Sequence, residues 1–147
     1  MFTERFWHQQ TIGAMHVKRI LFVCVENAGR SQMAEAFASY HGKDKIIVSS
    51  AGVRLTERVN PIVVEVMKEK GIDISSNRPK LLTSKMIEEA DQVITMGCSV
   101  EKFCPAPLFK KTTDWNLEDP KGKTIEKTRE IRDEIENKVK TLITEID

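Results

Sequence analysis

The sequence lacks a long hydrophobic run. No stretch approaches the roughly 18 apolar residues that a membrane-spanning helix requires. The N-terminal residues 1–15, MFTERFWHQQTIGAM, contain no apolar core of a signal peptide. We therefore expect a cytoplasmic protein with no membrane partner.

An excess of one charge is also missing. The 23 basic and 22 acidic residues are mixed along the chain and give a formal net charge of +1. This balance does not favour binding to nucleic acid or to a membrane surface. A chain of 147 residues, 40% of them hydrophobic, suits a single domain, and we expect a monomer.

Cysteine and tyrosine are scarce. Three cysteines, an odd number in a chain without a secretion signal, argue against a structural disulfide framework. The three cysteines are then expected to be catalytic, redox-active or buried thiols. The only tyrosine is Tyr40. The chain therefore offers few side chains of this type that could hold an aromatic substrate.

Short apolar runs alternate with amphipathic stretches along the chain. This alternation predicts an α/β fold, a four-stranded parallel sheet with helices on both faces. Residues 1–17 are polar and aperiodic, and we expect them to form a flexible arm before a single domain at 18–147. The predicted strands are 20–25, which we expect to be central, and 46–51, 92–96 and 111–114. The predicted helices are 31–42, 61–71, 84–90 and a closing helix with an apolar stripe from 131 to 146.

The stretch LFVCVENAGRSQMAEA, residues 21–36, joins the first predicted strand to the first predicted helix. In open α/β sheets, ligands bind beyond the carboxyl ends of the strands. Backbone N–H groups of this loop, together with the helix dipole, would cradle a tetrahedral oxyanion, and Arg30 would add a planar fork. The predicted oxyanion-binding residues are Val25, Glu26, Asn27, Ala28, Gly29 and Arg30.

Cys24 lies at the floor of this predicted cradle. The positive field of the loop favours its thiolate and makes it a nucleophile, and Ser31 can donate its hydroxyl to the sulfur. A simpler alternative is that Cys24 is a small core residue and Arg30 a surface charge.

The segment CVENAGRSQMAEAF resembles the phosphate-binding loop and first helix of the low-molecular-weight protein tyrosine phosphatase superfamily. Within that superfamily, it is similar to the arsenate reductases that are recycled by thioredoxin. The similarity extends over roughly residues 18–145. Further segments follow in family order, namely SSAG at 49–52, GIDIS at 71–75, ADQVITMGC at 90–98, DWNLEDP at 114–120 and IRDEIENKVK in the closing helix.

The resemblance implies that Asp119 is the general acid that protonates the departing oxygen. The alternative is that Asp119 only opens a turn before Pro120. The small phosphatases of the superfamily carry aromatic residues after this Asp-Pro pair, but Lys121, Gly122 and Lys123 follow here. Trp115 would be either a wall of the site or a half-buried core residue.

Cys98 and Cys104 favour a reductase over a phosphatase. Reduction of As(V) to As(III) needs two electrons, which a thiolate relay from Cys24 through Cys98 and Cys104 would supply. The implied reductant is thioredoxin or a small thiol, with no bound cofactor. Two alternatives are that both thiols are buried hydrophobes or that they bind zinc. Zinc binding is the weaker alternative, because the sequence has no second pair of cysteines and no nearby histidine to complete a set of four ligands.

Several positions depart from the family pattern. Glu26 replaces a frequent glycine and puts a carboxylate near the anion site, and Gly29 replaces a frequent cysteine. Some related reductases bind potassium, and the positions of that site match Asn27, Glu35 and Ser50. We expect the Lys80 ammonium either to take the cation's place or to be a solvated surface charge.

Three functions therefore remain open. The first is an arsenate reductase with arsenate or phosphate as the oxyanion in its loop. The second is a low-molecular-weight phosphatase that hydrolyses phosphoesters through a phosphocysteine intermediate. The third is a catalytically silent phosphate-binding module, against which the intact set of Cys24, Arg30, Ser31 and Asp119 argues.

Overall fold

A computed structural model of the chain describes residues 17–54, 56–97 and 112–146. The predicted flexible arm therefore lies almost wholly outside the described residues. Cys98 and Cys104 lie outside them as well. Among the described helices, none is both long and apolar enough to cross a membrane.

Four parallel strands form one sheet in the order β2-β1-β3-β4. The strands are β1 (Lys18–Cys24), β2 (Ile46–Gly52), β3 (Gln92–Thr95) and β4 (Thr112–Asp114). The prediction of a parallel sheet is confirmed, and so is the interior position of the first strand. The β1 residues from Ile20 to Cys24 are all buried, as expected for a strand covered on both faces.

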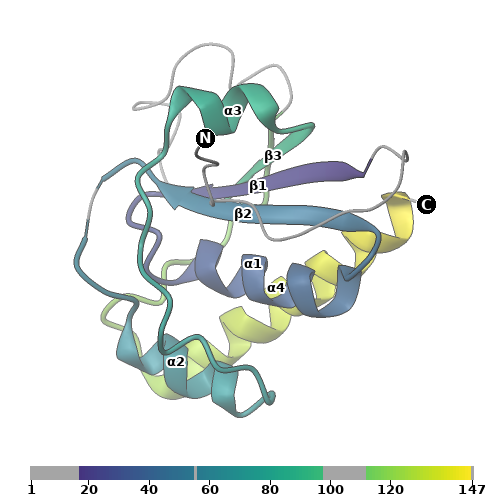
Figure 1. The fold of residues 1–147 in the computed structure, drawn as a ribbon. Coiled ribbons are helices and arrows are strands. Elements are labelled where there is room, and N and C mark those ends of the chain that lie inside the picture. Colours follow the sequence, from purple (N-terminus) through teal and green to yellow (C-terminus); the bar gives the residue numbers. More distant parts are fainter. Residues whose placement is uncertain (1–16, 55, 98–111, 147) are drawn as a thin grey trace.

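Helices cover both faces of the sheet, as predicted (Figure 1). Three of them, α1 (Arg30–Gly42), α2 (Pro61–Lys68) and α4 (Ile125–Ile146), lie on one face, and the short α3 (Ser84–Glu89) lies on the other. Side chains of β1 alternate between the two cores. Ile20 and Phe22 pack in the larger core with α1 and α4, whereas Leu21 and Val23 pack in the smaller core with α3.

Local sequence signals set the beginnings of two helices. The Asn60 side chain accepts the Ile62 N–H at 2.9 Å, and Pro61 occupies the first turn of α2. The Thr83 hydroxyl accepts the Met86 N–H at 3.2 Å at the start of α3. We predicted that the second helix would extend to Gly71, but α2 ends at Lys68 and a turn carries the chain to Gly71.

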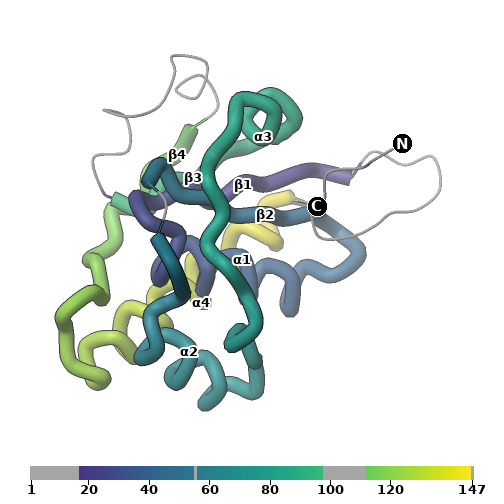
Figure 2. Tube along the Cα trace, turned by 60° about the vertical axis from the view of Figure 1, so that its left-hand side comes forward, coloured from purple at the N-terminus to yellow at the C-terminus, as the bar shows by residue number. Residues whose placement is uncertain are grey.

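The segment of residues 72–83 joins α2 to α3 and crosses the edge of the molecule beside β2 (Figure 2). It is attached at the last residue of that strand. The Gly52 N–H donates to the Lys80 carbonyl at 2.8 Å, and the Leu82 N–H donates to the Gly52 carbonyl at 2.7 Å. This attachment brings Lys80 close to the carboxyl ends of β1 and β2.

Candidate active site

The oxyanion loop, residues 25–29, leaves β1 and crosses directly over the last residue of β2. A Cβ atom at Gly52 would lie 2.7 Å from the Glu26 carbonyl carbon and 2.8 Å from the Asn27 nitrogen. These are backbone atoms that have no room to move, so the crossing requires glycine at this position. The chain after β2 then holds the loop, because the Arg54 N–H donates to the Val25 carbonyl at 2.9 Å.

Cys24 is the last residue of β1, and its thiol is almost completely buried beneath the loop. The Asn27 N–H donates to its sulfur at 3.1 Å, and the Ser31 hydroxyl lies 2.8 Å from the same sulfur. The Ser31 oxygen accepts a hydrogen bond from the Asn27 amide at 2.8 Å. The Ser31 hydroxyl hydrogen can thus be donated to a Cys24 thiolate, and both contacts would then stabilise negative charge on the sulfur.

The Asn27 side chain holds the loop together from below. Asn27 is fully buried and has a positive φ of 56°, a conformation that Asn tolerates better than most residues. Its amide nitrogen also donates to the Ser50 hydroxyl at 2.9 Å. Its oxygen accepts from the Gln32 side chain at 3.0 Å and from the Lys80 N–H at 2.8 Å. We predicted a role for Asn27 in anion and cation binding, but not this bracing role.

Arg30 begins α1 and is 4% exposed. Its Nη1 donates to the carbonyls of Met96 and Leu117, both at 2.9 Å. These contacts engage only Nη1 and fix the guanidinium plane, so Nε and Nη2, the latter 3.5 Å from Asp119, can face an anion. Two parallel N–H groups suit bidentate binding of a tetrahedral oxyanion.

Asp119 enters the site from the acid loop, residues 118–122, which follows β4. Its Oδ2 lies 3.5 Å from Nη2 of Arg30, and its side chain is 56% exposed. Its Oδ1 accepts the Lys121 N–H at 3.0 Å. Asp119 thus opens a turn and also faces the site, so the two roles considered for it are compatible.

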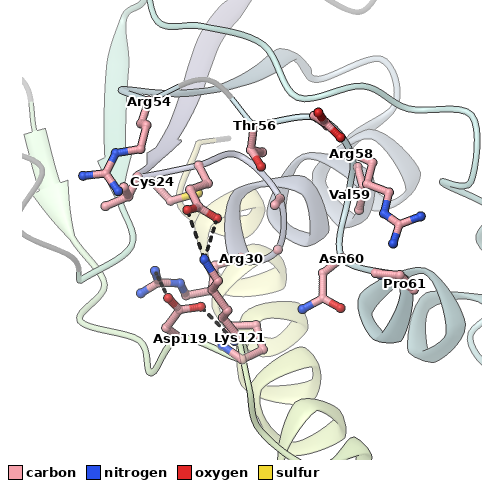
Figure 3. Close-up of a pocket in the computed structure, with 16 residues that line it drawn as sticks. Cys24, Arg30, Arg54, Thr56, Arg58, Val59, Asn60, Pro61, Asp119 and Lys121 are labelled. Carbon is pink, nitrogen blue, oxygen red and sulfur yellow. Dashed lines mark hydrogen bonds and ion pairs between the residues drawn. The ribbon is translucent and has the colours of Figure 1, made fainter.

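These segments enclose a pocket of about 580 Å³ above Cys24 (Figure 3). Its walls are the oxyanion loop, residues from the 54–61 segment and residues 119–121. All the predicted oxyanion-binding residues except Asn27 line it. Within the described part of the chain, no aromatic side chain does so. Trp115 packs in the core instead, with its ring centroid 5.7 Å from that of Phe22.

A second polar network lies behind Asn27. The Ser50 hydroxyl donates to the Glu35 carboxylate, and the Lys80 ammonium lies 3.4 Å from the same carboxylate. The Lys80 side chain is 31% exposed, so it is not a freely solvated charge. The described residues contain no group of three or more His, Cys, Asp or Glu side chains that could hold a metal ion.

The chain that leads to Cys98 is anchored at the site up to Gly97. Besides the Met96 contact with Arg30, the Gly97 N–H donates to Oδ1 of Asp114 at 2.7 Å. The Thr95 hydroxyl donates to the same oxygen at 2.7 Å. Asp114 was not among the predicted site residues. The available signal was an aspartate at the carboxyl end of a strand in a parallel sheet.

The fold and the pocket define a class of protein: an α/β protein with a buried cysteine and an arginine at the two ends of a strand-to-helix loop that lines a pocket. The sequence model of the family described as low molecular weight phosphotyrosine protein phosphatase matches residues 19–147. The chain therefore belongs to this family.

Two curated relatives are named as arsenate reductases. A glutaredoxin arsenate reductase from Synechocystis sp. is 37% identical over 134 residues, which cover 88% of this chain and 99% of the relative. An arsenate reductase from Staphylococcus aureus is 39% identical over 122 residues, which cover 82% of this chain and 92% of the relative.

Solved structures of two activities share the fold. An arsenate reductase in a phosphate-binding state has a TM-score of 0.81 at 36% identity, over 89% of this chain and 100% of that one. An arginine phosphatase from Geobacillus stearothermophilus has a TM-score of 0.78 at 33% identity, over 88% and 92%. A thioredoxin-dependent arsenate reductase from Corynebacterium glutamicum has a TM-score of 0.76 at 39% identity, over 91% and 64%.

Proposed function

We propose that this protein is an arsenate reductase that converts arsenate to arsenite, with Cys24 as the nucleophile. The observation that carries the proposal is the buried Cys24 sulfur, which receives the Asn27 N–H and contacts the Ser31 hydroxyl at the base of an arginine-lined pocket. This arrangement suits attack on a tetrahedral oxyanion. The similarity to two named arsenate reductases supports arsenate as the substrate.

In the first step, the Cys24 thiolate attacks arsenic(V) while Arg30 holds two oxygens of the anion. A sulfur–arsenic bond forms and an arsenic–oxygen bond breaks. The oxygen departs as water once a proton from Asp119 reaches it, because hydroxide is a poor leaving group. The position of Asp119, 3.5 Å from Arg30 at the pocket, supports this role.

In the second step, the Cys98 thiolate attacks the Cys24 sulfur. The sulfur–arsenic bond breaks and its electron pair remains on arsenic, which leaves as arsenite. A disulfide between Cys24 and Cys98 results, so two thiols are oxidised as arsenic(V) is reduced. The hydrogen bond from Arg30 to the Met96 carbonyl supports this route. Cys98 follows Met96 by only two residues, and two residues of chain span about 7 Å at most.

In the third step, the Cys104 thiolate attacks Cys98 and releases the Cys24 thiolate. An external thiol then reduces the disulfide between Cys98 and Cys104, with no bound cofactor. We propose thioredoxin for this role, since one similar structure is that of a thioredoxin-dependent reductase. Because one relative is named as a glutaredoxin arsenate reductase, glutaredoxin is the alternative reductant.

Two further assignments belong to this proposal. The Lys80 ammonium takes the place of a cation beside Glu35 and keeps the network behind Asn27 neutralised. Residues 18–147 act as a single catalytic domain, and the family match over 19–147 supports these bounds.

Phosphoester hydrolysis is a second candidate function. Asp119 lines the pocket, where a carboxylic acid could protonate an ester oxygen, and a similar structure belongs to an arginine phosphatase. In that chemistry, Cys24 forms a phosphocysteine that water hydrolyses, and no second thiol is needed. The absence of aromatic side chains among the described pocket residues argues against phosphotyrosine as the preferred substrate.

The test compares Cys24→Ser, Cys98→Ser and Cys104→Ser with the parent protein. We expect arsenate-dependent NADPH oxidation with thioredoxin and thioredoxin reductase to be abolished in all three. Hydrolysis of p-nitrophenyl phosphate should be lost only in Cys24→Ser. Mass spectrometry after one turnover should locate a disulfide that includes Cys98.

Other outcomes separate the alternatives. Full turnover by both Cys98→Ser and Cys104→Ser would exclude the three-cysteine relay and leave a single-cysteine reductase that uses a small thiol. Failure of every variant and of the parent to form arsenite, with ester hydrolysis intact, would establish the phosphatase instead.

A further inference from the structure

Two of the loops that line the pocket are joined by an ion pair at residues where this chain departs from the family pattern. The Lys121 Nζ lies 3.2 Å from Oε2 and 3.5 Å from Oε1 of Glu26. Glu26 belongs to the oxyanion loop and Lys121 to the acid loop, and both residues line the pocket. Figure 3 shows Lys121 extending from beside Asp119 toward the loop that follows Cys24.

The same two loops touch at a second point. A Cβ atom at Gly29 would lie 3.2 Å from the Pro120 side chain, so the loops are already in close contact there. Lys121 also donates its backbone N–H to Asp119. The oxyanion loop and the acid loop are therefore in contact at two places, the Glu26–Lys121 ion pair and the approach of Gly29 to Pro120.

The pocket volume by itself does not restrict the site to a free oxyanion. Its volume of about 580 Å³ is in the range that accommodates organic ligands. An ester group on a phosphate seated at Cys24 extends away from the sulfur, and one course for it runs between the oxyanion loop and the acid loop, which both line the pocket. Contact between the loops therefore affects an ester more than it affects a free anion.

We propose that Glu26 and Lys121 form a gate across the pocket that favours a free tetrahedral oxyanion over an oxyanion bearing an organic group. This inference rests on the proposed function, for which the gate selects inorganic arsenate. With the pair formed, a free anion fits beneath it, whereas an aryl group that extends between the two loops must separate Glu26 from Lys121. The Lys121 side chain is 70% exposed, so the pair is weak and we expect a preference of about three- to fivefold.

A purely electrostatic effect gives a different pattern. In that case, Glu26 would repel any dianion and Lys121 would attract it, whatever the dianion carries. Removing Glu26 would then strengthen binding of both ligands, and removing Lys121 would weaken both. The dissociation constant of an oxyanion that bears an organic group can be divided by that of a free oxyanion. This ratio cancels the electrostatic effect and retains only the discrimination by size.

The experiment measures that ratio for phenylphosphonate and inorganic phosphate by calorimetry. Both ligands are tetrahedral oxyanions, neither requires turnover, and they differ by the aryl group. The variants are Glu26→Gln, Lys121→Gln, the double glutamine variant and the charge-exchanged double variant Glu26→Lys with Lys121→Glu. Lys140→Gln is the matched control, because Lys140 is an exposed lysine whose ion-pair partner, Glu136, lies on the same helix, and neither residue lines the pocket.

We expect each single variant to improve phenylphosphonate binding relative to phosphate by about three- to fivefold. The double glutamine variant should show no further gain, because both single changes open the same gate. The charge-exchanged variant should return toward the parent ratio, and Lys140→Gln should not change it. An unchanged ratio in both single variants, or additive gains in the double variant, would overturn the gate.

These outcomes do not depend on arsenate reduction. A protein that forms no arsenite still gives both dissociation constants, so failure of the proposed function leaves the gate testable. Conversely, a fixed ratio with normal arsenite formation would reject the gate and leave the reductase in place.

Discussion

Replacing Asn27 by alanine should destabilise the whole domain, because this side chain joins four parts of the structure. The change removes hydrogen bonds to Ser31, Ser50, Gln32 and the Lys80 N–H. Each hydrogen bond contributes about 0.5–1.5 kcal/mol, and a buried group left unpaired costs more. Alanine at a φ of 56° adds about 1 kcal/mol of backbone strain.

The sum is a loss of about 4 kcal/mol in the free energy of unfolding, a large part of the roughly 5–15 kcal/mol typical of a domain. Asn27→Gly removes the same hydrogen bonds but not the freedom to adopt a positive φ. We therefore expect Asn27→Gly to be more stable than Asn27→Ala by about 0.5–1 kcal/mol, the reverse of the usual order.

Urea unfolding followed by circular dichroism measures both differences, and unchanged m-values would show that the denatured states are comparable. Gln32→Ala is a useful control, since it removes one of the four hydrogen bonds to Asn27 and leaves the backbone of the loop unaltered. A loss below about 1 kcal/mol in Asn27→Ala, or alanine more stable than glycine, would refute the bracing role.

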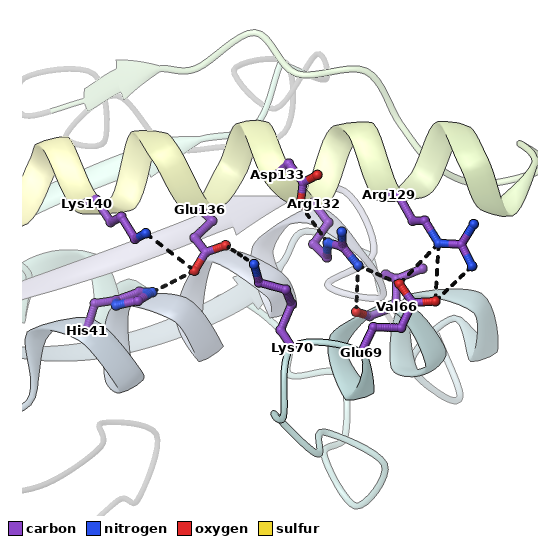
Figure 4. Close-up of polar contacts among 9 residues, drawn as sticks. All are labelled: His41, Val66, Glu69, Lys70, Arg129, Arg132, Asp133, Glu136 and Lys140. Atoms are coloured by element: carbon purple, nitrogen blue, oxygen red, sulfur yellow. Dashed lines mark hydrogen bonds and ion pairs between the residues drawn. The ribbon is translucent and has the colours of Figure 1, made fainter.

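Two further predictions concern Arg30 and Glu136. Arg30→Lys should bind inorganic phosphate at least tenfold more weakly than the parent by calorimetry, because an ammonium cannot serve two carbonyls and two anion oxygens in one plane. Burial raises the pKa of Glu136, but hydrogen bonds from His41 and Lys70 outweigh it and hold that pKa below its ordinary 4.5 (Figure 4). The stabilisation is therefore fully present above about pH 4.5 and is lost as the pH falls through the lower folded value. Urea titrations should show Glu136→Gln about 1–2 kcal/mol less stable than the parent at pH 6, with the difference shrinking toward pH 3.

The parts of the fold that follow from local pattern were predictable. The apolar run at Ile20 indicated a buried strand, and the order of runs and amphipathic stretches indicated the parallel sheet with two covered faces. Asn60 and Thr83 were recognisable helix starts because capping depends on a few neighbouring residues. The end of α2 was placed at Gly71 although the helix stops at Lys68, since an added turn before the glycine leaves no mark on the apolar spacing.

The candidate site was predictable where its residues are close in sequence. Cys24, Arg30 and Ser31 belong to one loop and one helix start, so their spacing alone brought them together. The partners of Arg30 were not predictable, because they are backbone carbonyls 66 and 87 residues away and carry no side-chain signal. The contact between Glu26 and Lys121 spans 95 residues and depends on how two loops meet.

The surroundings of Arg30 explain how a buried cation can keep its charge for a ligand. A buried guanidinium needs hydrogen bonds to offset the loss of water, and the carbonyls of Met96 and Leu117 supply them without neutralising the charge. Asp119 places a carboxylate 3.5 Å from Arg30, and its side chain is largely exposed. Met96 precedes Cys98 by two residues, and Leu117 precedes Asp119 by two residues. The side chain that we propose to bind the oxyanion therefore also contacts the segments that lead to the proposed second thiol and to the proposed proton donor, so three distant parts of the sequence meet at one guanidinium.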